Sequence, residues 1–89
     1  MAERTVTIAS ASGLHARPAA LFSQAAGQQP AQVTIAKGEG EPVQASSILM
    51  LLTLGADQGD EVTLRAEGEG AEESVTALAE MLERDLDTD

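Results

Sequence analysis

Residues 12–20 read Ser-Gly-Leu-His-Ala-Arg-Pro-Ala-Ala, a stretch that predicts the start of a helix. Proline is favoured in the first helical turn, because it lacks an N–H that would find no partner there and its φ is already helical. Good helix formers follow Pro18, and Gly27 supplies a C-terminal stop. We therefore expect His15 at the start of a helix that ends near Ala26, with Arg17 in its first turn.

Three features of this helix start favour an anion. The unpaired backbone N–H groups and the helix dipole attract negative charge, and Arg17 is one of only five basic residues. Taken singly, a histidine beside a helix start is often a cap or a packing residue, and an arginine is often a solvated charge. Together with His15, the only histidine of the chain, they predict a site that holds a phosphate.

Other chemistry at His15 is poorly supported. Serine-type nucleophilic catalysis would need this histidine as its base, and the chain has no Gly-x-Ser-x-Gly elbow. One histidine and no cysteine would leave only carboxylates as co-ligands for a metal ion. We therefore expect neither a metal nor a cofactor.

Composition indicates one small domain spanning residues 1–89. Phe22 is the only aromatic residue, so the core must be built from aliphatic side chains, and no cysteine is present to form a disulfide. We see no signal peptide, and the longest apolar stretch, Ile48–Leu52, is too short to span a bilayer. A soluble, cytoplasmic protein is expected.

The charge is unevenly placed along the chain. Residues 1–56 are balanced, whereas residues 57–89 contain twelve acidic residues and only two basic ones, Arg65 and Arg84. Without a basic patch or an aromatic platform, nucleic-acid binding and an anionic membrane surface are both disfavoured. The acidic third is expected to be a solubilising face.

Four segments show the alternation or the turn signals of short strands. Strands are expected at residues 4–9, 32–37, 42–45 and 61–67. A last helix is indicated by apolar residues at helical spacing. These residues are Val75, Leu78, Ala79, Leu82 and Leu86.

A short second helix is bracketed by Ser47 as its N-cap and Gly55 past its end. Its residues Ile48–Leu52 are apolar all the way round, so some of them must be partly exposed. The element order is then β-α-β-β-α-β-α. We expect an α+β open-faced β-sandwich, in which three helices cover one side of a four-stranded antiparallel sheet.

Residues 13–19 match the active-site pattern Gly-Leu-His-x-Arg-Pro-Ala of the HPr family. These are the histidine-containing phosphocarriers of the bacterial phosphoenolpyruvate-dependent sugar phosphotransferase system. A second block is also similar, namely Ser47, the short apolar helix ending in Leu54-Gly55 and the turn at Gln58-Gly59. The chain resembles this family over essentially its whole length.

The resemblance implies that His15 accepts a phosphoryl group from phosphorylated enzyme I, as a pros-phosphohistidine intermediate. His15 would then pass the group to the IIA domain of a sugar permease, while Arg17 stabilises the phosphate. Such a protein is a carrier and does not turn over a substrate alone.

In many family members a serine that opens the second helix is phosphorylated by a dedicated kinase. The resemblance places this position at Ser47, with its neighbour Ser46 less favoured. Because Ser47 is also a sufficient N-cap, its presence alone does not indicate a serine kinase or phosphatase.

The chain departs from many relatives in lacking lysines around the active site, where Arg17 is nearly the only base. Docking of partners through apolar contacts is therefore expected. A monomer is the default expectation. The expected docking residues are Ala16, Ala20, Ser47, Leu49, Met50 and Leu52.

Two alternatives stay open. The first is an HPr-like regulatory phosphocarrier or protein-interaction module without a direct role in sugar transport. The second is a small-molecule-binding α+β domain that uses the helix start as an anion site. The intact block at residues 13–19 favours the phosphocarrier.

Overall fold

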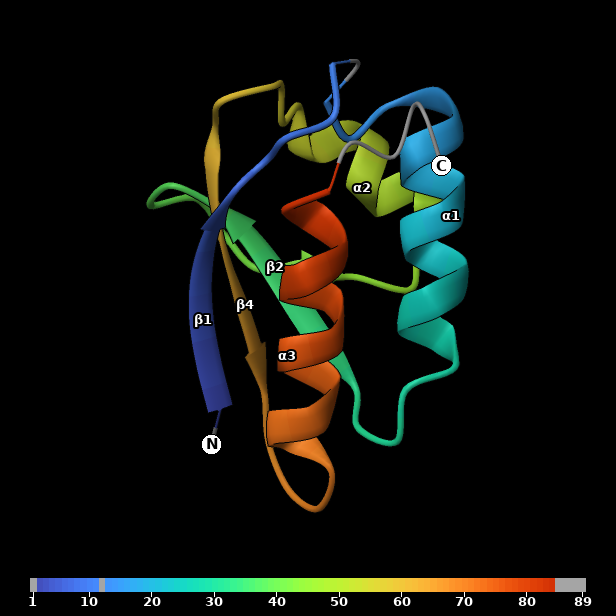
Figure 1. Ribbon diagram of the computed structural model, residues 1–89, viewed down its shortest axis with the longest axis vertical. Coiled ribbons are helices and arrows are strands. Elements are labelled where there is room, and N and C mark those ends of the chain that lie inside the picture. Colours follow the sequence, from blue (N-terminus) through green and yellow to red (C-terminus); the bar gives the residue numbers. More distant parts are fainter. Residues whose placement is uncertain (1, 12, 85–89) are drawn as a thin grey trace.

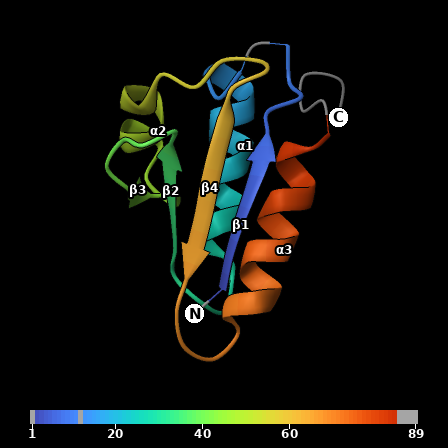
Figure 2. The same cartoon turned by 90° about the vertical axis from the view of Figure 1, so that its left-hand side faces the viewer.

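The computed structural model describes residues 2–11 and 13–84, and it shows a sheet with helices on one of its faces (Figures 1 and 2). The strands are β1 (Ala2–Thr7), β2 (Val33–Lys37), β3 (Val43–Gln44) and β4 (Glu61–Ala66). The helices are α1 (Ala16–Gly27), α2 (Ile48–Leu54) and α3 (Ala71–Leu82). The element order and the open-faced sandwich predicted from the sequence are confirmed.

The strands lie in the order β1-β4-β2-β3, and every neighbouring pair is antiparallel. β4 is thus central, and its alternating side chains meet apolar partners on both sides. Val62 pairs with Val6 of β1, and Leu64 pairs with Ile35 of β2. These side chains are buried on one face of the sheet, as the sequence alternation predicts.

The helices close this face. α3 contacts β1, β4 and β2, while α1 lies beside α3 and α2 (Figure 1). The only aromatic residue, Phe22, is fully buried at the centre of α1, and Leu78 and Leu82 bring the apolar stripe of α3 onto the sheet. The acidic side chains of α3 face solvent, so the helix is amphipathic as expected.

Some boundaries differ from the predictions. β1 runs over residues 2–7 rather than 4–9, yet Ile8 stays buried and its N–H donates to the carbonyl of Asp60 at 3.0 Å. Gly27 was expected just past α1 but is its last residue, because Gln28 caps the helix through N–H bonds to carbonyls of the preceding turn. Leu86 lies outside the described residues.

The loops gather at two opposite ends of the longest dimension, which measures 32 Å (Figure 1). One end holds the segments 8–11, 13–15 and 55–60. The other holds the β4–α3 loop at residues 67–70, together with the start of α3. Four exposed carboxylates belong to this far end, which we call the acidic end: Glu67, Glu69, Glu72 and Glu73.

Candidate functional site

His15 is the N-cap residue of α1. Its backbone is extended, with φ −129° and ψ 164°, and its side chain makes no capping hydrogen bond. The imidazole is 39% exposed, so it is held by the fold yet open to a second protein. The predicted position of His15 at the helix start, with Arg17 in the first turn, is confirmed.

The loop that carries His15 is held against the turn after α2. Leu14 is buried, and its N–H donates to the carbonyl oxygen of Ala56 at 2.9 Å. Gly13 has a φ of +66°, and a Cβ on it would lie 2.5 Å from that oxygen and 2.7 Å from Cα of Asp57. Only glycine allows this approach, so residues 13 and 14 fix the place of His15.

Asp57 lies directly beside the imidazole, with 3.1 Å between its Oδ1 and Nε2 of His15. The turn that carries Asp57 is held by a hydrogen bond of its own, since the N–H of Asp57 donates to Oδ2 of Asp60 at 2.8 Å. Lys37 pairs with Asp60 at 3.4 Å and donates to the carbonyl of Gly55 at 3.0 Å. The Asp57 N–H, helped by Lys37, lowers the pKa of the Asp60 carboxyl below its ordinary value, although desolvation partly opposes this.

The sequence analysis assigned no function to Asp57. It lies 42 residues from His15 in the chain, in a turn that showed only Asp and Gly signals. No pattern in one sequence reveals this pairing, because it exists only once α1 and the turn after α2 are packed together.

Arg17 is exposed in the first turn of α1, on the side of the molecule that carries His15. Its guanidinium is a fixed positive charge with several N–H donors that suit a phosphoryl group. The N-terminus of α1 adds partial positive charge at the same place. These groups can stabilise an anion that reaches the imidazole.

Of the expected docking residues, Leu49, Met50 and Leu52 lie on α2, which packs against α1 (Figure 1). Only Leu51 of the run 48–52 is buried, and the other four side chains form what we call the α2 patch. Their exposed fractions are Ile48 40%, Leu49 73%, Met50 41% and Leu52 43%. The predicted exposure of this helix is confirmed.

The remaining site predictions are placed as follows. Ser47 is the N-cap of α2, and its Oγ accepts a hydrogen bond from the N–H of Met50 at 3.4 Å. Ser46 is exposed, and Ala20 is partly exposed on α1. The side chain of Ala16 lies outside the described part of the chain.

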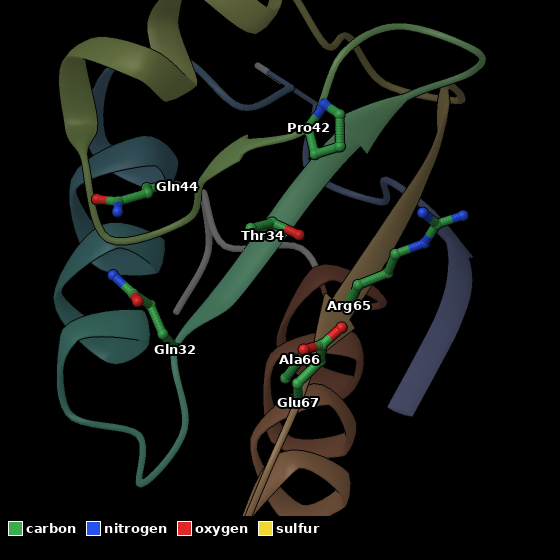
Figure 3. A pocket seen from close by; sticks show the side chains of 7 residues that line it. All are labelled: Gln32, Thr34, Pro42, Gln44, Arg65, Ala66 and Glu67. Atoms are coloured by element: carbon green, nitrogen blue, oxygen red, sulfur yellow. The ribbon is translucent and has the colours of Figure 1, made fainter. Parts of the chain in front are cut away.

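A hollow of about 450 Å³ lies elsewhere, on the open face of the sheet (Figure 3). The cross-strand neighbours Thr34 and Arg65 are among its lining residues, and Pro42 lies at its upper rim. None of the predicted site residues lines it.

Neither a metal-binding cluster nor a membrane-spanning helix is found among the described residues, 2–11 and 13–84. No group of three or more His, Asp or Glu side chains there could hold a metal ion. No helix in that part of the chain has the length and apolar character needed to cross a membrane.

Comparison with known proteins identifies the family. The family model described as "PTS HPr component phosphorylation site" matches residues 2–84. The chain belongs to the HPr family. HPr proteins are phosphocarriers of the phosphotransferase system, so the chain is a carrier and not an enzyme, as the sequence predicted.

Individual relatives are similar to this chain over nearly its whole length. The phosphocarrier protein HPr of Streptomyces coelicolor is 47% identical and covers 98% of this chain and 94% of its own length. The HPr-like protein Crh of Bacillus subtilis is 38% identical, covering 97% of this chain and all of its own. The crystal structure of HPr-C-His from Thermoanaerobacter tengcongensis, 42% identical, has a TM-score of 0.86 over 93% of this chain and 92% of its own. HPr of that organism has also been solved as a dimer, with a TM-score of 0.69 over 93% of this chain and 94% of its own.

Proposed function

We propose that His15 is the phosphoacceptor of this carrier, receiving a phosphoryl group from phosphorylated enzyme I and passing it to IIA domains of sugar permeases. The observation that carries the proposal is the imidazole at the N-cap of α1, 39% exposed and making no capping bond. Enzyme I and IIA domains are the phosphotransferase-system partners that the family implies.

The chemistry needs a ring nitrogen with a free lone pair. That nitrogen attacks phosphorus, and the bond between phosphorus and the donor's nitrogen breaks with its electrons returning to the donor. Because the transferring group is strongly anionic, catalysis rests on charge stabilisation and positioning. Arg17 and the N-terminus of α1 supply the positive charge.

We assign partner docking to the α2 patch, together with Ala20 of α1 and Ser47, the N-cap of α2. Exposed apolar side chains of this kind are typical of protein-binding surfaces. A phosphate on Ser47 would lie at the helix N-terminus beside the α2 patch, so it would impair docking. We propose Ser47, and not Ser46, as the regulatory position if a serine kinase is present in the cell.

We also propose that residues 1–89 act as one cytoplasmic domain and as a monomer, with phosphoacceptance independent of assembly. Sedimentation at several protein concentrations tests the monomer. A stable dimer at micromolar concentration would overturn it.

The test is phosphorylation by phosphoenolpyruvate and enzyme I, read by intact mass, with His15→Ala in parallel. One acid-labile phosphate that is absent in the variant would support the proposal. No added phosphate, with enzyme I shown to be active on a known HPr, would overturn it. Arg17→Gln should slow transfer while His15 remains the modified residue.

A second function is favoured by the α2 patch itself, and by the likeness to Crh. In this reading the α2 patch binds a regulatory partner, and His15 has no part in sugar transport. The same experiment separates the two, since only the phosphocarrier must gain phosphate on His15.

A further inference from the structure

We propose that Asp57 is a positioning residue for phosphoryl transfer, which holds the proton of the neutral imidazole on Nε2 so that Nδ1 presents the attacking lone pair. This inference deepens the proposed function and rests on His15 being the phosphoacceptor. It starts from one contact, the 3.1 Å between Nε2 of His15 and Oδ1 of Asp57.

The contact fixes the tautomer because a carboxylate can only accept a hydrogen bond. Nε2 must then donate, and in a neutral imidazole the other nitrogen carries the lone pair. Nδ1 is the pros nitrogen, so Asp57 selects the nitrogen expected to become phosphorylated. The two ring nitrogens point in divergent directions, so the carboxylate stays away from the incoming anion.

The same hydrogen bond strengthens as the reaction proceeds. When Nδ1 bonds to phosphorus, the ring gains positive charge and its Nε2–H becomes a better donor. The proton stays on Nε2 throughout, while the Nδ1–P bond forms and the donor's N–P bond breaks. An interaction that is stronger in the transition state than before it accelerates the step.

The backbone of Asp57, which carries this carboxylate, is held in place by its neighbours. The Asp57 N–H is fixed by Asp60, and its Cα lies against Gly13 in the loop that carries His15. Lys37 pairs with Asp60, which leaves Oδ1 of Asp57 to serve the imidazole. The backbone of Asp57 is thus fixed by bonds that do not involve its carboxylate.

The alternative is that the exposed contact between Asp57 and His15 has no functional role. Asp57 is 72% exposed, and such pairs contribute little to folding. A small free energy is nevertheless enough to select a tautomer, because the two neutral forms of imidazole differ little. Replacing Asp57 should therefore change the tautomer of His15 and the rate of phosphoryl transfer, and not the free energy of unfolding.

The test compares the wild type with Asp57→Ala and Asp57→Asn, with Glu61→Gln as the matched charge control. Glu61 is an exposed carboxylate at the start of β4 and is not paired with His15. Long-range ¹H–¹⁵N NMR at a pH where His15 is neutral reports the tautomer directly. Single-turnover transfer from saturating phosphorylated enzyme I reports the chemical step separately from docking.

We expect the wild type to be Nε2-protonated and Asp57→Ala to slow the saturated step by about three- to tenfold, with unfolding unchanged. Asp57→Asn should be at least as slow, because its amide can donate to Nε2 and favour the wrong tautomer. Glu61→Gln should match the wild type.

Two outcomes would overturn the role of Asp57 while leaving His15 as phosphoacceptor. One is a wild-type imidazole protonated on Nδ1, and the other is an unchanged tautomer and rate in Asp57→Ala. Failure of the proposed function is distinguishable, because the wild type itself would then gain no phosphate on His15.

Discussion

The N–H of Leu14 donates a 2.9 Å hydrogen bond to the carbonyl oxygen of Ala56, so the loop that carries His15 is bound to the turn after α2. This contact holds the loop that carries His15 beside the turn that carries Asp57. The site therefore depends on backbone geometry as much as on the side chains that do the chemistry.

Gly13→Ala tests this geometry. The new Cβ would overlap the carbonyl of Ala56 and would also suffer the strain of a positive φ, so we expect a loss of about 2–5 kcal/mol in the free energy of unfolding. Gly38→Ala is the matched control, since Gly38 has a φ of +55° and nothing within 4 Å of its Cβ position. Urea unfolding followed by far-ultraviolet circular dichroism measures both. Equal losses would contradict the role of the close contact.

Two of the four leucines of α2, Leu49 and Leu51, should differ in how much their replacement by alanine destabilises the fold. Leu51 is fully buried, so Leu51→Ala should cost about 2–4 kcal/mol of unfolding free energy. Leu49 is 73% exposed, so Leu49→Ala should cost less than about 0.5 kcal/mol. The same urea experiment compares them. A large loss in Leu49→Ala would mean that its side chain packs against the protein and is not free for a partner.

Docking should depend on the α2 patch and only weakly on salt. Leu49→Ala is expected to raise the KM for phosphorylation by enzyme I by about three- to tenfold with little change in the maximal rate. Because Arg17 and Lys37 near His15 are balanced by Asp57 and Asp60, raising salt from about 0.05 to about 0.5 M should change kcat/KM less than about twofold. Steady-state assays measure both, and a steep fall with salt would indicate docking by charge.

Lowering the pH should weaken the hydrogen bond between the N–H of Asp57 and the carboxylate of Asp60. The folded-state pKa of Asp60 is lowered, first by the N–H of Asp57 and then by Lys37, so its carboxylate stabilises the fold above the ordinary Asp pKa of about 3.9. This contribution is lost as the pH falls from there through the folded-state pKa. Asp60→Asn should therefore be less stable than the wild type near pH 6, and the gap should close as the pH falls through the folded-state pKa. Urea unfolding at several pH values measures the gap, which a constant difference would contradict.

Much of the fold could be predicted because its local signals agree. Alternation along β4, the Ser47 and Gly55 caps of α2 and the apolar stripe of α3 each indicate one structure, and each is confirmed. The end of α1 was less predictable, because a glycine such as Gly27 can either follow the last residue of a helix or be that last residue itself. His15 and Arg17 could be selected because they are rare residue types at a helix start. Asp57 could not, since an acidic residue in a turn is ordinary until tertiary packing brings it to the imidazole.

The acidic end has a consequence for how this strongly negative molecule meets its partners. Charges in salt water act over a Debye length of about 8 Å at physiological ionic strength, a fraction of the 32 Å that spans the two ends. The four carboxylates of the acidic end are therefore screened at the His15 end and add little to the field that a protein approaching His15 meets. At close range the acidic end repels a negatively charged surface, so a partner of that charge should contact the His15 end in preference to the acidic end.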